Sequence, residues 1–306
     1  MLKKFIVLSL AILPFISKAQ IALFSNDKNE KLKDPEPSIG IVYYDFSYVS
    51  DTTKPENVSN QTMALSFGKD YSKFYSSTFK TEDSLIKADL TRQITEQNGL
   101  GNINLSARSS IKGTPDVFLI DLKSEKIFEV KRIGMKSYLV SGDNNTINWD
   151  IQDSTKKIGD YTCQKAVGLS KGRNYIVWFS TDLPYSYGPR RLFGLPGLIL
   201  EAYDETNRIV YHFKSLEMTT SGQLGLPENG IPATAKEYKD LEKAFKADPS
   251  GFLKSSMQGS VSGASFGAPA GGNVQIKSIT INKGDGPNGK KSSPKIINFP
   301  IDLTED

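Results

Sequence analysis

The 306-residue chain has one cysteine and one histidine, Cys163 and His212. A single cysteine cannot form an internal disulfide, so packing alone must stabilise the fold. One histidine and one cysteine also cannot build a zinc site of the usual kind. Carboxylate-bound calcium stays open, although the sequence contains no EF-hand loop. We therefore expect no metal site and no cofactor.

The chain also lacks a large charge of either sign, with 38 basic and 34 acidic residues. This balance gives no electrostatic reason to expect nucleic acid or an anionic membrane surface as a partner. The one long apolar run is at residues 5–16, after two lysines and before small residues. This order predicts a signal peptide at residues 1–19, cleaved after Ala19, and an exported periplasmic or cell-surface protein without a transmembrane segment.

Alternating apolar and polar residues predict a mainly β fold. Residues 41–48 and 63–67 each place apolar side chains on one face of a strand, and residues 68–70 form a turn before another strand. Apolar residues four apart predict helices at 83–97 and 234–246. We expect a curved antiparallel sheet or an incomplete β-barrel with one or two short helices. Further extended segments are predicted at residues 117–122, 127–132, 137–140, 147–151, 158–168, 274–281 and 296–303.

Changes in composition divide the chain after the signal peptide. Residues 20–38 are a polar leader, residues 39–248 are the β-rich domain, and residues 249–306 are a Gly/Ser-rich flexible extension with a last short strand. Residues 224–232 contain two prolines and two glycines and are interpreted as a loop. Gly159 and Asp160 are interpreted as a bulge or bend.

The segment at residues 178–204 organises the central part of the sequence. Pro196 fixes its own φ and Gly197 tolerates a positive φ, which predicts a type II turn at residues 195–198. An apolar strand at 198–203 and a hairpin loop at 204–207 should follow. The structural motif is the hexapeptide Gly194, Leu195, Pro196, Gly197, Leu198 and Ile199.

Several short motifs occur around this hexapeptide in a fixed order. CQKA at 163–166, NYIVWFS at 174–180, Leu-Pro at 183–184 and Gly-Pro at 188–189 precede GLPGLI. Together they resemble the GLPGLI family, secreted proteins of Bacteroidetes-type bacteria without an assigned biochemical role. The resemblance is densest over residues 158–216, and residues 298–303 are similar to the C-terminus usual in that family. It implies a family and export, and it carries no catalytic or ligand residues.

Three motifs could indicate catalysis or phosphate binding. Residues 263–267 match the GxSxG nucleophile elbow and residues 284–289 match GxGxxG, but neither has the strand and helix that its chemistry needs. Cys163 and His212 could form a nucleophilic pair. We expect Cys163 to be a buried structural residue and His212 to be solvated, so no catalytic residue is assigned.

The carboxylates of Asp45 and Glu201 have the least ordinary positions. Glu201 interrupts an apolar run, and we expect it on the solvent-facing side of its strand. Arg190 or Arg191 could pair with it or capture an anionic ligand, and aromatic residues of the preceding loop could be exposed. The candidate binding residues are Tyr185, Tyr187, Arg190, Arg191 and Glu201.

These features favour a cell-envelope binding or accessory protein without catalysis. Its ligand could be hydrophobic or peptide-like and lie on the concave face of the sheet or at residues 185–195, and an envelope protein, a peptide or a glycan could be the partner. The alternative is a secreted hydrolase that uses paired carboxylates. Two or more buried acids in one cleft would favour the hydrolase, whereas an apolar groove without them would favour binding.

Overall fold

The computed structural model describes residues 31–96, 100–107, 112–133, 136–141, 146–248, 275–283 and 297–303. The expected signal peptide, the linker at 250–273 and the motifs at 263–267 and 284–289 lie outside the described residues. Most of the described chain is β-strand, as expected, and two helices accompany the strands.

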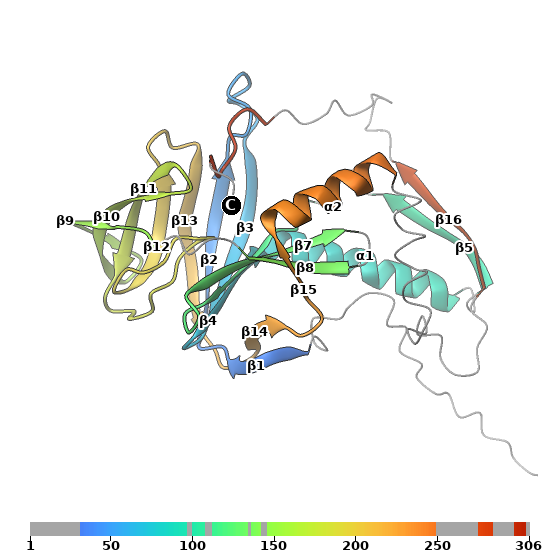
Figure 1. The fold of residues 1–306 in the computed structure, drawn as a ribbon, viewed down its shortest axis with the longest axis horizontal. Helices are drawn as coiled ribbons and strands as arrows, with labels where there is room; N and C mark the ends of the chain where they lie inside the picture. The colour runs from blue at the N-terminus through green and yellow to red at the C-terminus, as the bar shows by residue number, and fades with distance from the viewer. Residues whose placement is uncertain are drawn as a thin grey trace, which may run out of the picture.

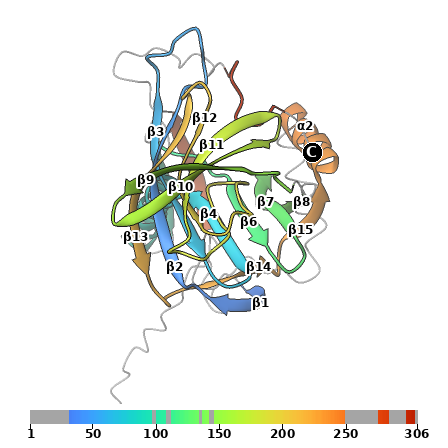
Figure 2. The same cartoon turned by 90° about the vertical axis from the view of Figure 1, so that its left-hand side faces the viewer.

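Twelve strands form one curved sheet that does not close into a barrel (Figures 1 and 2). Its order is β15-β8-β7-β6-β4-β3-β2-β13-β12-β11-β10-β9. All neighbours are antiparallel except β15 and β8, which run parallel. The strands are β2 (Gly40–Tyr48), β3 (Ser59–Phe67), β4 (Tyr71–Ser76), β6 (Val117–Asp121), β7 (Lys126–Ile133), β8 (Lys136–Ser141), β9 (Asp150–Ile158), β10 (Tyr161–Ser170), β11 (Arg173–Ser180), β12 (Leu198–Asp204), β13 (Ile209–Met218) and β15 (Ile231–Thr234).

The main core covers one face of this sheet. On β2, Val42, Tyr44 and Phe46 are buried while Asp45 between them is exposed, as the alternation predicts. Phe46 stacks on Tyr211 of β13 with ring centroids 4.6 Å apart. The cluster extends across the sheet from Ile127 of β7 to Cys163 and Ala166 of β10.

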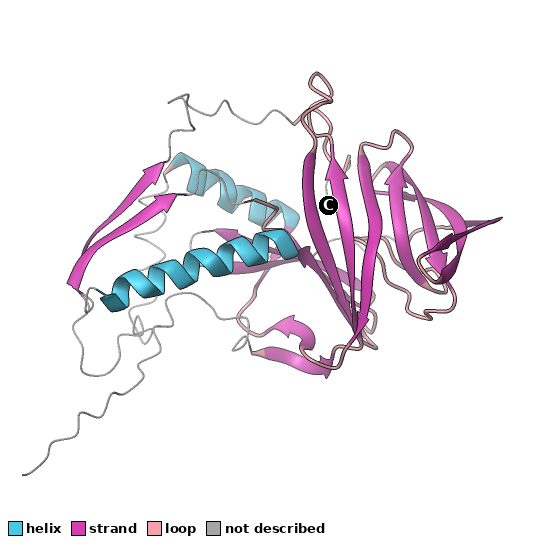
Figure 3. Cartoon of the chain, turned by 180° about the vertical axis from the view of Figure 1, so that it is seen from behind, coloured by secondary structure: helices cyan, strands magenta, loops and turns pink. Residues whose placement is uncertain are grey.

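Helix α1 (Ser77–Glu96) follows β4 without a connecting loop and extends away from the sheet (Figure 3). The predicted helix at 83–97 is confirmed, but it begins six residues earlier. The Ser76 hydroxyl accepts a hydrogen bond from the Phe79 amide at 3.0 Å and satisfies one of the open amides of the first turn. The serines at this point fit the end of a strand as well as the start of a helix. The sequence pattern therefore does not show where β4 ends and α1 begins.

Helix α2 (Ala235–Ala247) packs on β8 and β15 through a small second core. Tyr238, Leu241 and Phe245 contact buried residues that include Tyr138 and Val140. The predicted helix at 234–246 is therefore confirmed.

Two small sheets lie beside the large one. Strands β1 (Leu32–Pro37) and β14 (Gln223–Pro227) pair antiparallel, and β5 (Leu100–Ala107) and β16 (Gln275–Lys283) pair parallel. Part of the polar leader thus joins the fold as β1, and the strand predicted at 274–281 is present as β16. The loop predicted at 224–232 is wrong, because its backbone pairs with β1 and β8, two segments far away in the sequence.

One turn differs from its prediction. Gly197 does not have a positive φ, so the predicted type II turn is wrong; Gly194 has the positive φ instead, at 94°. A Cβ at Gly197 would stand 2.1 Å from the Ser180 carbonyl oxygen, so close backbone packing is what requires glycine there. Gly159, at φ 58°, and Asp160 form the turn of the β9–β10 hairpin, which agrees with the bend that was one of the two alternatives predicted there.

The C-terminal segment, residues 297–303, returns to the main core. It contains no strand, but Phe299 and Ile301 pack against the core. The Arg173 guanidinium donates to the carbonyl oxygens of Pro300, at 2.5 Å, and Ile301, at 3.1 Å. This part of the predicted flexible extension is therefore seated on the sheet.

Candidate functional site

The face of β2, β3 and β13 opposite the core is polar and borders the start of α1. Because β2 and β3 alternate, Asp45, Ser47 and Thr62 point away from the core that their neighbours fill. The register places Asp45 between His212 of β13 and Thr62 of β3. Three strands and one helix therefore contribute polar side chains to one surface.

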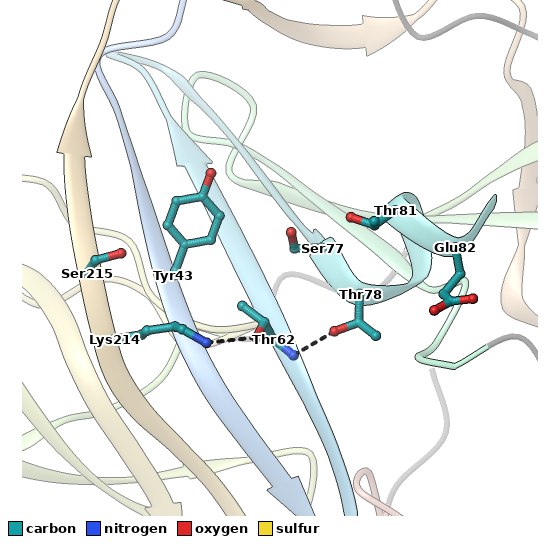
Figure 4. A pocket seen from close by; sticks show the side chains of 8 residues that line it. All are labelled: Tyr43, Thr62, Ser77, Thr78, Thr81, Glu82, Lys214 and Ser215. Atoms are coloured by element: carbon teal, nitrogen blue, oxygen red, sulfur yellow. Dashed lines mark hydrogen bonds between the residues drawn. The ribbon is translucent and has the colours of Figure 1, made fainter. Parts of the chain in front are cut away.

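A first depression of about 440 Å³ lies where α1 meets the sheet (Figure 4). The hydroxyl of Thr78 accepts a hydrogen bond from the Thr62 amide at 2.9 Å, which ties the helix to β3. Lys214 Nζ donates to Thr62 Oγ1 at 3.2 Å and to Asp45 Oδ1 at 2.8 Å. The lining residues are Tyr43, Thr62, Ser77, Thr78, Thr81, Glu82, Lys214 and Ser215.

Tyr43 supplies a phenol group to this depression. Burial raises the pKa of Tyr43, the nearby Glu217 carboxylate and Tyr75 raise it further, and Lys80 opposes them. The phenol therefore keeps its proton well above neutral pH and can donate a hydrogen bond.

A second depression of about 530 Å³ adjoins the first and shares Thr62 and Thr78 with it. Gln61 is held in place by its side-chain oxygen, which accepts hydrogen bonds from Ser76 Oγ at 2.7 Å and from the Thr114 amide at 3.0 Å. The lining residues are Asp45, Phe46, Ser47, Asn60, Gln61, Thr62, Thr78 and His212. We call the two depressions together the outer groove.

One end of the outer groove meets a cluster around Glu201. Its Oε1 lies 2.8 Å from His212 Nδ1, and its Oε2 accepts a hydrogen bond from Lys156 Nζ. Lys156 also lies over the Trp178 ring, 4.4 Å from the centroid, and the Trp178 indole donates to the Tyr203 hydroxyl at 3.3 Å. Glu201 is only 9% exposed, so its predicted solvent-facing position is wrong, because a lysine and a histidine from neighbouring strands cover it. The His212 side chain is 62% exposed, as expected.

The other four candidate binding residues lie outside the outer groove. Tyr187 is 1% exposed and belongs to the main core, and Tyr185 is half-buried with its ring 4.7 Å from that of Phe67. Arg191 is buried, Arg190 is largely buried with 14% of its side chain exposed, and both contact Phe118 rather than Glu201. The prediction that this loop exposes its aromatic and basic side chains is therefore wrong. Its Pro and Gly residues suggest a surface loop, but they instead allow the backbone to bend so that these side chains pack against the core.

Arg190 and Arg191 form a buried ion-pair network. Arg190 Nη2 lies 2.8 Å from Asp302 Oδ2, and Arg191 Nη2 lies 2.6 Å from Glu129 Oε1. Burial works against the charge of Arg190, but Asp302 outweighs it and the pKa of Arg190 is raised. Burial likewise opposes the charge of Glu129, yet Arg191 and Lys131 hold its pKa below the usual value. Arg190 and Glu129 therefore both stay charged at neutral pH.

Cys163 is a buried free cysteine, as expected. Burial raises the pKa of its thiol to about 11, so it is protonated and a poor nucleophile at neutral pH. Among the described residues, no three His, Cys, Asp or Glu side chains gather as metal ligands would. No helix in the same part of the chain is both long and apolar enough to cross a membrane.

Sequence reasoning selected Glu201, Asp45 and His212 but missed most of the outer groove. The alternation of β2 and β3 identifies Ser47, Asn60 and Thr62 as outward-facing. It cannot reveal that α1 begins beside them, because the helix start was placed six residues too late. An earlier helix start would have brought Thr78 to the same surface.

Comparisons with known proteins give a family-model match over a short stretch and several similar solved structures. A family described as a protein of unknown function (Porph_ging) matches residues 169–201, which span β11 and the GLPGLI hexapeptide. No curated protein matches the sequence. Two crystal structures of PNGF-II, in space groups P21 and C2, are similar with TM-scores of 0.47 and 0.44 and identities of 17% and 16%. Each match covers 66% of this chain and 32% of the PNGF-II chain, so this chain spans about a third of it.

Proposed function

We propose that this protein is an exported binding protein of the cell envelope and that the outer groove holds its ligand. The observation that supports this most directly is the lining of the two adjoining depressions, in which almost every side chain can donate or accept a hydrogen bond. Such side chains can bind the polar groups of a ligand by hydrogen bonds.

The charges of the outer groove favour a neutral ligand. Lys214 is paired with Asp45, and His212 with Glu201, and Glu82 adds one further carboxylate at the start of α1. The outer groove therefore has no cluster of charges of one sign. The remaining groups are mostly hydroxyls and amides, which match the hydroxyls of a glycan. We therefore propose a neutral glycan segment as the ligand.

The arrangement of acids also supports binding rather than hydrolysis. Among the described residues that line or adjoin the outer groove, Glu201 is the one buried acid, and Lys156 and His212 occupy its two oxygens. Asp45 is exposed and paired with Lys214. Two buried acids in one cleft, the feature that would favour a hydrolase, are not brought together there.

A glycan array followed by calorimetry tests the proposed ligand. The variant Asn60→Ala/Lys214→Ala removes two groups of the outer groove and should abolish binding of the glycans that the wild type retains. Lys126→Ala, an exposed residue on β7, is the matched control and should leave binding unchanged. If the protein binds members of a peptide library but no glycan, and the same double substitution abolishes that binding, the ligand is a peptide rather than a glycan. Unchanged glycan binding by the double variant would show that the outer groove is not the binding site.

Hydrolysis by carboxylates is the second candidate, because Asp45 and Glu201 flank His212 from neighbouring strands. Glu201→Gln keeps the shape of the side chain and should not alter binding if the protein only binds. A glycan that the wild type cleaves and Glu201→Gln does not would favour the hydrolase.

Export is the part of the proposal that rests on residues 1–19. The intact mass of the protein recovered from the envelope should correspond to a chain that begins at Gln20. A mass that retains Met1 would contradict export by cleavage.

A further inference from the structure

The C-terminal segment is held mostly through its backbone. The amides of Asn298 and Phe299 donate to the Ser50 carbonyl at 3.0 and 3.1 Å, and the Tyr48 hydroxyl donates to the Phe299 carbonyl at 2.5 Å. Arg173 donates to two further carbonyls, and the Leu303 amide donates to the Lys171 carbonyl at 2.9 Å. This is the way in which proteins bind extended peptides, since main-chain contacts give affinity without requiring a particular sequence.

Three side chains of the segment provide specific contacts. Asn298 Oδ1 accepts a hydrogen bond from the Thr52 amide at 2.8 Å, and Asn298 Nδ2 donates to Asp51 Oδ1 at 3.2 Å. The guanidinium of Arg173 lies 4.1 Å from the centroid of the Phe299 ring, and that of Arg208 lies 5.1 Å from it. Three positions later, Asp302 accepts a hydrogen bond from Arg190 Nη2 and lies 3.8 Å from Arg191 Nε. We call Arg173, Arg190 and Arg191 the arginine pocket.

The charges of the arginine pocket require an anionic group at the position of Asp302. Arg173 lies 3.7 Å from Asp204, and Arg191 pairs with Glu129, which also binds Lys131. Among the described residues, Asp302 is the carboxylate that is hydrogen-bonded to Arg190. Loss of Asp302 from its place would leave a buried guanidinium facing an open position, which is costly unless another anion enters.

The segment itself is seated at the surface. Ile297 is 57% exposed and Leu303 is 53% exposed, while Phe299 and Ile301 are partly buried. Displacement would therefore expose the apolar contacts of two partly buried side chains, Phe299 and Ile301, and leave the fully buried residues of the main core in place. The pocket is built into the sheet and its connecting loop, whereas its occupant is a short peripheral piece of chain.

We propose that the arginine pocket is a binding site for an acidic peptide, that Phe299 and Asp302 are its built-in ligand, and that a partner segment with an aromatic residue three positions before a carboxylate can replace them. The backbone contacts with Ser50, Tyr48 and Arg173 would be remade by a segment that adopts the same bent backbone conformation. Arg190 selects the carboxylate, and Arg173 together with Arg208 selects the aromatic ring.

A labelled peptide, Ile-Asn-Phe-Pro-Ile-Asp-Leu, tests this site in the full-length protein by fluorescence anisotropy. Phe299→Ala/Asp302→Ala weakens the built-in ligand and should bind the peptide at least ~10-fold more tightly than the wild type, because occupancy by the protein's own segment lowers the apparent affinity. Adding Arg190→Gln to this variant should abolish binding, and so should replacing the peptide's aspartate by asparagine. Adding Arg132→Gln instead, an exposed arginine on β7, should leave binding intact.

Two results would overturn the proposal. One is an absence of binding by a Phe299→Ala/Asp302→Ala protein that still unfolds cooperatively, and the other is binding that Arg190→Gln does not change. If the double variant does not fold, hydrogen exchange in the wild-type protein tests the proposal instead. Excess peptide should then accelerate exchange at the Phe299 and Leu303 amides, and unchanged exchange would reject the site.

Discussion

At the scale of single residues, Gly194 and Gly197 are required for different reasons. A Cβ at Gly197 would clash with the backbone of Ser180, which cannot move without disturbing the end of β11. At Gly194 the space is open, with the nearest atom 3.9 Å away, and the constraint is the φ of 94°. The same amino acid thus serves close packing at one position and backbone conformation at the other.

We predict that Gly197→Ala lowers the free energy of unfolding by about 2 kcal/mol or more, as overpacking does. Gly194→Ala should cost about 1 kcal/mol, since alanine tolerates a positive φ poorly. Urea denaturation of both variants measures this order. A larger loss for Gly194→Ala would show that conformation, rather than close packing, governs the hexapeptide.

We predict that Cys163 reacts with iodoacetamide slowly in the native state and rapidly after denaturation. Burial raises the thiol pKa to about 11 in the folded state, whereas an exposed cysteine has a pKa of about 8.5. The folded state keeps the thiol proton up to a higher pH than the unfolded state does. The contribution of Cys163 to the free energy of unfolding is therefore fully present below about pH 8.5 and falls as the pH rises toward 11. Comparing wild type with Cys163→Ala between pH 8 and 10 isolates the effect. Equal pH slopes for the two proteins would argue against a raised pKa.

At the scale of elements, the sequence predicted those strands and helices that have a clear local pattern. The alternation at Val42, Tyr44 and Phe46 is enough to predict β2 and its buried face. The charged, amphipathic residues of 234–246 are enough for α2. By contrast, β14 and β15 form because partners distant in the sequence satisfy their backbone groups. Local composition contains no information about such partners.

The candidate site was harder to predict than the strands that form it. Glu201 was noticed because a charge interrupts an apolar run, but its burial depends on Lys156 and His212, which reach it from other strands. Arg190 was expected in an exposed loop, and its burial depends on Asp302 near the other end of the chain. Pairings over such distances determine exposure, and no window of sequence contains both members.

At the scale of the whole molecule, Arg190 joins three distant regions. Its guanidinium lies 4.4 Å from the Phe118 ring of β6 and pairs with Asp302 of the C-terminal segment, while its own backbone belongs to the connection before β12. We predict that Arg190→Ala lowers the free energy of unfolding by about 2 kcal/mol or more, because the partly buried Asp302 carboxylate loses its partner and the Phe118 ring loses its contact with the guanidinium.

The exposed pair of Lys214 and Asp45 provides the comparison for Arg190. Lys214→Ala should change the free energy of unfolding by less than about 1 kcal/mol, because both side chains are solvated. Thermal and urea unfolding of the two variants test the difference. Equal losses would mean that the Arg190 network contributes little more than a surface pair.

The pairing of β2 with β13 has a consequence for how the chain is made. Gly40 lies opposite Met218 and Tyr48 opposite Ile209, so one side of β2 has no partner until the ribosome has added β13. At 5–20 residues per second, that edge stays open for roughly ten seconds or longer. During this interval the nascent strand, which contains three tyrosines and three further large apolar residues, is a template for misassembly between neighbouring chains. The order of synthesis therefore makes delayed folding, or protection by a chaperone, a requirement that follows from the topology.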